Sequence, residues 1–188
     1  MSTNFSLIFG QPGSGKDSRV KIISEICKLK IINFGDILRD TINDKSNSNL
    51  KKECLKSGLI DDTEVNKIFL NLFNLLDKNS NILLNSYPKT ETQYLFMLNL
   101  LNLRNSHINN LFVMEDLSFV EIKKRILERQ YLERFDDSII EKRCKTYEII
   151  TKPLIKKIIC DNIIYLKANY DEFHYELIYN EILSKIKK

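Results

Sequence analysis

Short apolar runs alternate with longer amphipathic patterns along the chain. The apolar runs lie at residues 5–9, 31–32, 81–85, 111–114 and 163–166. Short runs of this kind predict buried strands, and apolar residues spaced three and four apart predict helices. The alternation of the two predicts an α/β fold with a five-stranded parallel sheet flanked by helices.

The predicted helices follow the predicted strands in turn. They cover residues 20–29, 62–76 and 93–103, with further helices beginning near Leu117 and Asp171. Pro153 lies inside another helical pattern. Because proline removes a backbone hydrogen bond and clashes with the carbonyl four residues earlier, we expect it to kink or divide that helix near Ile149.

A glycine-rich loop separates the first predicted strand from the first predicted helix. Residues 10–18 read Gly-Gln-Pro-Gly-Ser-Gly-Lys-Asp-Ser. Glycines let the backbone N–H groups approach phosphate oxygens, and the helix N-terminus and Lys16 add positive charge. The strand-loop-helix setting predicts a phosphate-binding loop, or P-loop. In the general motif Ser or Thr follows the lysine, whereas this chain has Asp17.

The loop resembles the variant Gly-x-Pro-Gly-x-Gly-Lys-Gly-Thr of adenylate kinases and their nucleoside monophosphate kinase relatives. Asp17 stands at the glycine that directly follows the lysine, and Ser18 stands at the threonine. The resemblance implies a P-loop NTPase-like, three-layer α/β/α fold. It also implies that ATP is bound by Gln11, Pro12, Gly13, Ser14, Gly15, Lys16, Asp17 and Ser18.

Two segments resemble the family's acceptor side. Residues 31–39 resemble His-Ile-Ser-Thr-Gly-Asp-x-Leu-Arg, which implies that Arg39 grips the acceptor monophosphate; a guanidinium offers paired donors for this task. Phe34 replaces a small residue of the nucleoside pocket and is expected either to stack on a base or to obstruct it. Residues 55–63 resemble x-Gly-x-Leu-Val-Pro-Asp with one residue missing, which implies base contacts at Leu59 and Ile60.

Residues 85–93 resemble Asp-Gly-Phe-Pro-Arg-Thr-x-x-Gln, with its charged members altered. Asn85 replaces the aspartate that orders Mg²⁺-bound water, Ser86 replaces the glycine and Lys89 replaces the catalytic arginine. Lysine keeps the charge but loses the planar fork, so we expect a weaker hold on the transferring phosphoryl group. Gln93 is implied to read an adenine edge, which favours AMP.

The carboxylate missing at Asn85 has a counterpart at Asp17. One hypothesis is that Asp17 takes over part of the Mg²⁺ ordering, with the metal held through ATP and water. The alternative is that an acid in the first turn of a helix is favourable without any metal.

The donor side is carried by arginines. Arg125 and Arg129 match Arg-x-x-x-Arg, which implies contacts with the donor adenine and phosphates, while Arg134 and Arg143 match the two arginines that flank the family's Asp-Asp pair. The resemblance thus assigns catalysis to Lys16, Lys89, Arg129, Arg134 and Arg143. AMP binding falls to Phe34, Arg39, Leu59, Ile60, Ser86, Lys89, Gln93, Arg134 and Arg143.

The family pattern spans nearly the whole chain and implies one domain over residues 1–188. Its core would comprise 1–33, 68–128 and 138–188, with a helical acceptor-binding insert at about 34–67 and a short lid at about 129–137. The implied reaction is reversible transfer of the ATP γ-phosphoryl group to AMP with Mg²⁺. Two alternatives stay open: UMP or CMP as acceptor, and a nucleotide-binding relative that has lost most catalysis.

Composition narrows the class of protein. The 188 residues are 43% hydrophobic, enough for one sizeable core. The net charge of +4 suits a site for phosphorylated ligands and equally a solvated basic surface. The four cysteines form no Cys-x-x-Cys, and no apolar run reaches the roughly 18 residues of a membrane span. We expect a cytoplasmic monomer without nucleic-acid or membrane partners.

Overall fold

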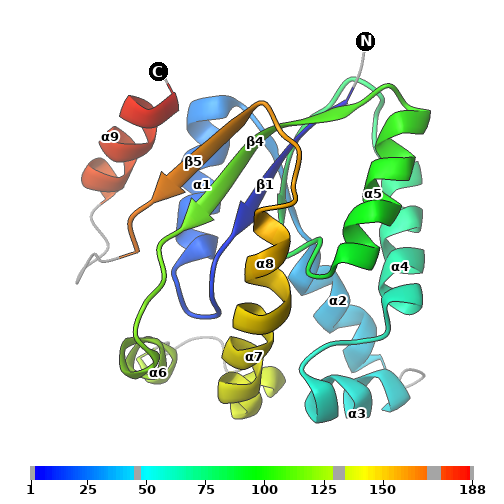
Figure 1. The fold of residues 1–188 in the computed structure, drawn as a ribbon, viewed down its shortest axis with the longest axis vertical. Coiled ribbons are helices and arrows are strands. Elements are labelled where there is room, and N and C mark those ends of the chain that lie inside the picture. The colour runs from blue at the N-terminus through cyan, green and yellow to red at the C-terminus, as the bar shows by residue number, and fades with distance from the viewer. Residues whose placement is uncertain (1–2, 45–47, 129–133, 169–174, 187–188) are drawn as a thin grey trace.

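The computed structural model describes residues 3–44, 48–128, 134–168 and 175–186. Its strands are β1 (Asn4–Phe9), β2 (Lys30–Asn33), β3 (Asn81–Asn85), β4 (His107–Met114) and β5 (Asn162–Leu166). They form a parallel sheet in the order β2-β3-β1-β4-β5 (Figure 1). The predicted α/β fold with a five-stranded parallel sheet is confirmed.

One strand begins earlier than predicted. β4 starts at His107 rather than Leu111, and its polar first half hid it from the hydrophobic pattern. Asn110 Nδ2 donates to Ser6 Oγ of β1 at 3.2 Å, so a side-chain pair takes the place of apolar packing there.

Helices connect the strands and cover both faces of the sheet. They are α1 (Lys16–Cys27), α2 (Phe34–Asn43), α3 (Ser48–Ser57), α4 (Asp62–Asn74), α5 (Glu91–Leu103), α6 (Phe119–Leu127), α7 (Ile140–Thr146), α8 (Lys152–Ile155) and α9 (Tyr175–Ile186). A 3₁₀ turn, η2 (Phe135–Ile139), precedes α7, and a π-helical turn, η3 (Tyr147–Thr151), joins α7 to α8. The predicted start of the last helix, 171–174, lies outside the described residues. No helix in the described ranges is long and apolar enough to cross a membrane.

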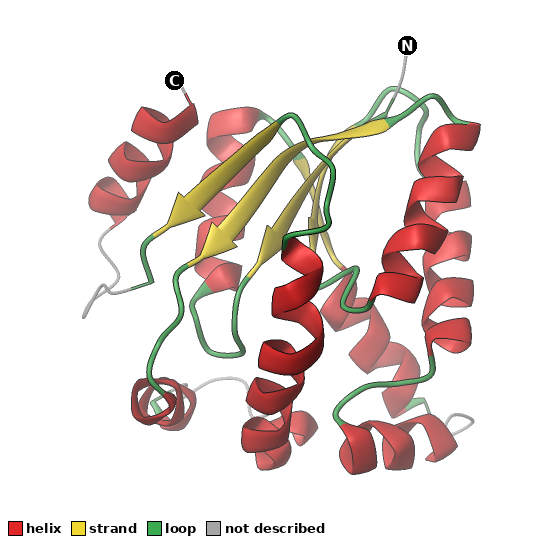
Figure 2. Ribbon diagram, in the orientation of Figure 1, coloured by secondary structure: helices red, strands yellow, loops and turns green. Residues whose placement is uncertain are grey.

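Two hydrophobic cores lie on opposite faces of the sheet because strand side chains alternate in direction. On β1, Phe5, Leu7 and Phe9 face the core that includes residues of α4 and α5, whereas Ile8 faces the core shared with α1 and α9. The ribbon in Figure 2 shows the resulting layers: α1 lies behind the sheet with α9 to its left, whereas α8 lies in front of the sheet and α5 to the right.

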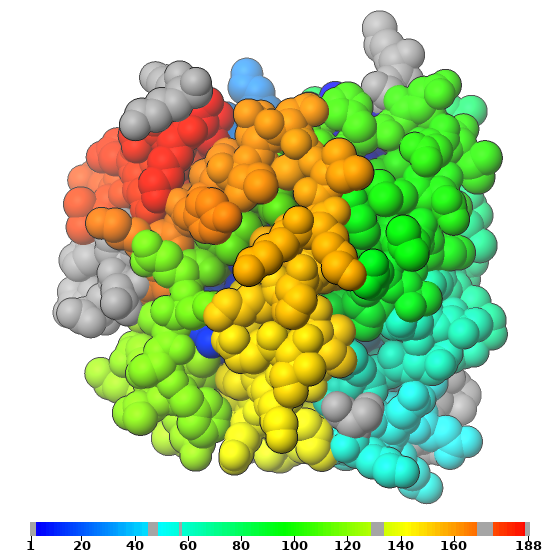
Figure 3. Space-filling model, in the orientation of Figure 1, coloured from blue at the N-terminus to red at the C-terminus, as the bar shows by residue number. Residues whose placement is uncertain are grey.

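The segment after residue 134 links distant parts of the chain. In Figure 3 the yellow segment that holds α7 lies between the lime-green segment of α6 and the cyan segment of α3. Lys142 of α7 donates to the carbonyl oxygens of Leu55 and Lys56 of α3, at 3.2 and 2.7 Å. These hydrogen bonds hold the start of α7 against the last turn of α3.

The expected interruption by Pro153 is confirmed. Pro153 lies in the first turn of α8, and the helix changes to a π-helical turn over residues 147–151, around the carbonyl of Ile149 with which a proline at 153 would clash. Thr151 of this turn donates its Oγ1 hydrogen to the carbonyl oxygen of Lys89 at 3.0 Å. The irregular turn thus contacts the loop after β3.

Candidate phosphate-binding active site

The P-loop joins the carboxyl end of the central strand β1 to the first turn of α1. Gly13 and Gly15 have φ angles of 78° and 84°, in the left-handed region that favours glycine. Ser14 N donates to Gln11 O at 3.2 Å and closes the loop. No side chain caps the N-terminus of α1, so its N–H groups can meet an anion.

The P-loop forms part of a cavity of about 490 Å³. The positively charged residues that line it are Lys16, Arg19, Arg39, Lys89, Lys124, Arg125, Arg134 and Arg143. They come from α1, α2, the loop after β3, α6, the start of η2 and α7. The structure therefore brings together the predicted cations, except for Arg129, which lies outside the described residues. A cavity of this volume is in the range that holds small-molecule ligands.

Lys16 is folded back onto its own loop. Its Nζ donates to the carbonyl oxygens of Gly10 and Gln11 at 2.6 and 2.8 Å. Burial lowers the pKa of Lys16 to about 7, and the positive charges of Arg143 and Lys89 act in the same direction, against Asp17. A bound anion would favour the charged form again.

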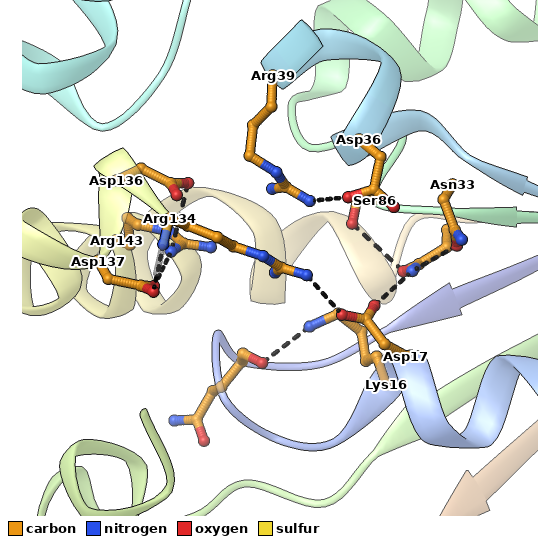
Figure 4. Close-up of polar contacts among 12 residues, drawn as sticks. Lys16, Asp17, Asn33, Asp36, Arg39, Ser86, Arg134, Asp136, Asp137 and Arg143 are labelled. Atoms are coloured by element: carbon orange, nitrogen blue, oxygen red, sulfur yellow. Dashed lines mark hydrogen bonds and ion pairs between the residues drawn. The ribbon is translucent and has the colours of Figure 1, made fainter. Parts of the chain in front are cut away.

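Asp17 stands between the P-loop and the carboxyl end of β3. Asn85 Nδ2 donates to Asp17 Oδ1 at 2.9 Å, and the Arg134 guanidinium donates to Asp17 Oδ2 at 3.0 Å (Figure 4). Asn85 Nδ2 also lies 3.2 Å from Asn33 Oδ1 at the end of β2. Partial desolvation opposes ionisation of Asp17, but Lys16 and these hydrogen bonds hold its pKa below the usual range.

Two acids of η2 hold Arg143. The guanidinium Nη1 lies 3.3 Å from carboxylate oxygens of both Asp136 and Asp137, and all three side chains are at least four-fifths buried. Asp137 Oδ2 also accepts the backbone N–H of Arg134 at 3.2 Å. The Asp-Asp pair thus fixes the side chain of one predicted catalytic arginine and the backbone of the other.

Arg39 and Lys89 line the cavity from α2 and from the loop after β3. In Figure 4 the guanidinium of Arg39 points toward Asp36, with which it forms an ion pair. Burial lowers the pKa of Lys89 to about 8, with Arg143 acting in the same direction. Ser86, which follows β3, has a positive φ of 73°, in the left-handed region that favours glycine.

Phe34 does not face the cavity. Its ring is 1% exposed and packs against the rings of Tyr87 and Phe69, with centroids 4.8 and 5.9 Å apart. Neither stacking on a base nor obstruction of the base pocket describes this side chain. Phe34 points away from the cavity because its ring packs in an aromatic cluster with Tyr87 and Phe69 in the core.

Gln93 is engaged within the protein. It is 2% exposed, its Nε2 donates to Asp62 Oδ1 at 2.7 Å, and its Oε1 accepts the Lys89 backbone N–H at 2.7 Å. Its amide therefore supports the Lys89 loop in this structure. A contact with adenine would require it to leave Asp62.

Three other predicted binding residues contact the protein itself or line a smaller cavity. Gln11 is 6% exposed, and its amide links the backbone N–H of Leu117 to the carboxylate of Glu148. Ile60 is buried in the core. Leu59 lines a second cavity, of about 80 Å³, beside Lys16 and Lys89.

Sequence reasoning missed several contributors. Asn33 contacts Asn85 at the carboxyl ends of β2 and β3, and Arg19 and Lys124 line the cavity from α1 and α6. Asn33 could have been found as a polar residue at the carboxyl end of a buried strand, where parallel sheets place their ligands. Lys124 carries no local signal that separates it from an exposed helical lysine.

The oxygen donors of the cavity suit Mg²⁺ held jointly with a nucleotide. Within the described ranges, no three His, Cys, Asp or Glu side chains are grouped so as to hold a metal ion directly. Asp17 contributes a carboxylate beside Lys16, and Asn85 contributes an amide oxygen. One or two carboxylates together with substrate phosphates and water are the usual ligands of Mg²⁺.

Comparison with known proteins gives a consistent result. A sequence model of the family described as "Adenylate kinase" matches residues 8–160. The adenylate kinase of Azobacteroides pseudotrichonymphae is 33% identical over 145 residues, which cover 74% of this chain and 75% of the relative. That of Thermococcus sibiricus is 33% identical over 148 residues, 73% of this chain and 65% of the relative. That of Bartonella quintana is 29% identical over 160 residues, 80% and 83% respectively. The matched region contains every residue that lines the larger cavity.

Proposed function

The chain belongs to the adenylate kinase family, and we propose that it reversibly transfers the γ-phosphoryl group of Mg-ATP to AMP. One observation carries the proposal: cations from segments far apart in the sequence line a single cavity around the P-loop. Helices α6 and α2 lie on opposite sides of that loop, so a donor and an acceptor nucleotide can approach from either side (Figure 1). Such an arrangement suits two nucleotides bound with their phosphates facing each other at the P-loop.

The charge of the cavity supports the same substrates. A triphosphate and a monophosphate together carry about six negative charges, since each terminal phosphate has a second pKa near 6. The P-loop, Lys16 and Arg125 would hold the ATP phosphates, and Arg39 and Lys89 the acceptor phosphate. Arg134 and Arg143 would lie at the transferring group, together with Arg129, whose placement is outside the described residues.

In the proposed reaction, the protein would catalyse transfer by positioning the two nucleotides and by stabilising the developing negative charge. Phosphoryl transfer needs little covalent work from the protein, so the rate comes from aligned oxygens and from cations that are already in place when charge develops. Mg²⁺ brought with ATP would neutralise part of the phosphate charge. The acceptor insert (34–67) and the short lid (129–137) remain part of the proposal as the segments that would exclude water from the transfer.

AMP is proposed as the acceptor because the relatives are named adenylate kinases and because the chain has Gln93. Because Gln93 is held by Asp62, AMP binding would be coupled to a change of hydrogen-bond partner. Phe34 packs in the core and therefore offers no argument for UMP or CMP.

A coupled assay of ADP formation from ATP tests the function. With AMP, UMP, CMP and dTMP as acceptors, we expect kcat/KM for AMP to exceed the others by about 10-fold or more, as hydrogen-bonded base recognition allows. A higher kcat/KM for UMP or CMP would overturn the acceptor. If no acceptor gave turnover while a two-headed adenosine pentaphosphate raised the Tm, the protein would bind nucleotides without acting as a kinase.

A further inference from the structure

We propose that Asp17 is the protein carboxylate that orients the Mg²⁺ of bound Mg-ATP, with Asn85 as the hydrogen-bonding support of that carboxylate. The inference rests on the proposed function, since it requires that Mg-ATP occupy the P-loop. In the family pattern a carboxylate at position 85, at the end of β3, has this role. The proposal assigns it to Asp17, next to Lys16 of the P-loop.

Asp17 is placed to face a cation. Its side chain is 60% exposed, it lines the cavity, and it follows Lys16 directly in the first turn of α1. Three of the other acids that line the cavity form ion pairs: Asp36 with Arg39, Glu121 with Arg125 and Asp136 with Arg143. Asp17 is instead the acid that the phosphate-binding loop carries into the cavity.

Asn85 is placed to support a carboxylate rather than to replace one. It is 2% exposed, and its Nδ2 is directed at Asp17 Oδ1 and Asn33 Oδ1. Its Oδ1 accepts from Ser86 Oγ at 3.3 Å. A neutral, buried amide whose nitrogen points toward Asp17 fixes the orientation of that carboxylate and leaves the negative charge on the exposed side chain.

The ion pair between Asp17 and Arg134 would be affected by metal binding. Arg134 donates to Asp17 Oδ2 at 3.0 Å, so the carboxylate already has a cationic partner when no nucleotide is present. A divalent cation beside Asp17 would repel the guanidinium and would compete for the same oxygen. Binding of Mg-ATP would therefore release Arg134 toward the phosphates.

The contact between the two side chains makes the proposal testable by exchange. Asp17 and Asn85 lie 2.9 Å apart across the hydrogen bond, and Asp and Asn have nearly the same shape. The double variant Asp17→Asn with Asn85→Asp moves the carboxylate to the end of β3 and keeps a hydrogen bond between the two positions. It is a matched control for the single variant Asp17→Asn.

The experiment is calorimetric titration of ATP, without any acceptor, in excess Mg²⁺ and in EDTA. We expect the parent to bind ATP more tightly with Mg²⁺, and Asp17→Asn to lose about 10-fold or more of that gain, the scale seen when a supporting group of a metal site is removed. In EDTA the same variant should bind ATP as tightly as the parent or more tightly, because a negative charge next to the phosphates has gone. The double variant should recover the Mg²⁺ gain.

These outcomes separate the possible failures. An equal Mg²⁺ gain in the parent and in Asp17→Asn would overturn the role of Asp17 and would leave the kinase proposal standing. Weaker binding of Asp17→Asn by the same factor in Mg²⁺ and in EDTA would assign Asp17 to loop structure and would also overturn the inference. If the parent bound no ATP under either condition, the proposed function itself would fail.

Discussion

Substitution of Lys16 by methionine is expected to lower kcat/KM for ATP by about 10³-fold while leaving the Tm of the empty protein unchanged or higher. The ammonium group is placed by the carbonyl oxygens of Gly10 and Gln11 in the middle of the cationic cavity. Loss of one preorganised donor to a developing charge costs about 10²- to 10³-fold, and Lys16 would contact both the bound and the transferring phosphate.

The stability part of this prediction follows from burial. The pKa of Lys16 is lowered to about 7, mainly because burial disfavours the charged ammonium. A buried cation whose pKa is lowered in this way destabilises the folded protein near neutral pH, and methionine fills a similar volume without the charge. Steady-state kinetics and thermal unfolding measure the two effects.

Lys142→Met is the matched control for Lys16→Met. Lys142 also donates to two backbone carbonyl oxygens, but it is exposed and lies outside the lining of the cavity. Its replacement should leave kcat/KM within about 2-fold and stability within roughly 0.5 kcal/mol, as for ordinary surface positions. A Lys16→Met protein with more than a tenth of parental activity would refute the role given to this lysine.

Arg143→Ala is expected to reduce both turnover and stability. The guanidinium pairs with Asp136 and Asp137, and the three side chains are nearly buried. Removal of one partner from a buried ion pair costs about 3–5 kcal/mol, because the remaining charges lose their compensation. For a chain of this size that corresponds to a fall in Tm of at least about 6 °C. Turnover should fall by about 10²-fold or more with the lost cation at the transferring group.

The ion pair of Lys157 and Glu91 is the natural comparison for Arg143. Its side chains are 54% and 55% exposed, so Lys157→Met should cost no more than about 1 kcal/mol and should leave turnover unchanged. Thermal unfolding and the ADP assay on both variants make the comparison. A Tm for Arg143→Ala equal to that of Lys157→Met would contradict the structural part of the prediction.

The sheet could be predicted from the sequence because its strands are short and mostly apolar, and the central strands β1 and β3 are buried on both faces. The hydrophobic pattern of β3 and β5 marks them to within one residue, whereas the asparagines of β4 concealed its first half. The P-loop and the order of the cations along the chain were likewise readable, since motif spacing is a local property.

The contacts between distant side chains could not be predicted. Asp17 and Asn85 are 68 residues apart, and only the pairing of β1 with β3 brings them to one edge of the sheet. Phe34 and Gln93 were assigned to the base pocket by resemblance. In the structure Phe34 packs in an aromatic cluster, and the Gln93 amide donates a hydrogen bond to Asp62. Tertiary packing determines which side chains become partners, and this packing cannot be inferred from any single segment of the sequence.

Whether the cations converge on one polyphosphate can be seen in a crystal structure with a two-headed adenosine pentaphosphate, because that ligand spans both nucleotide positions. We predict that Lys16 leaves the carbonyl oxygens of its loop, that Arg134 leaves Asp17, and that nitrogens of Lys16, Arg134 and Arg143 lie within about 3.2 Å of phosphate oxygens. A bound ligand with Arg134 and Arg143 turned away from its phosphates, still paired as in the empty protein, would contradict it.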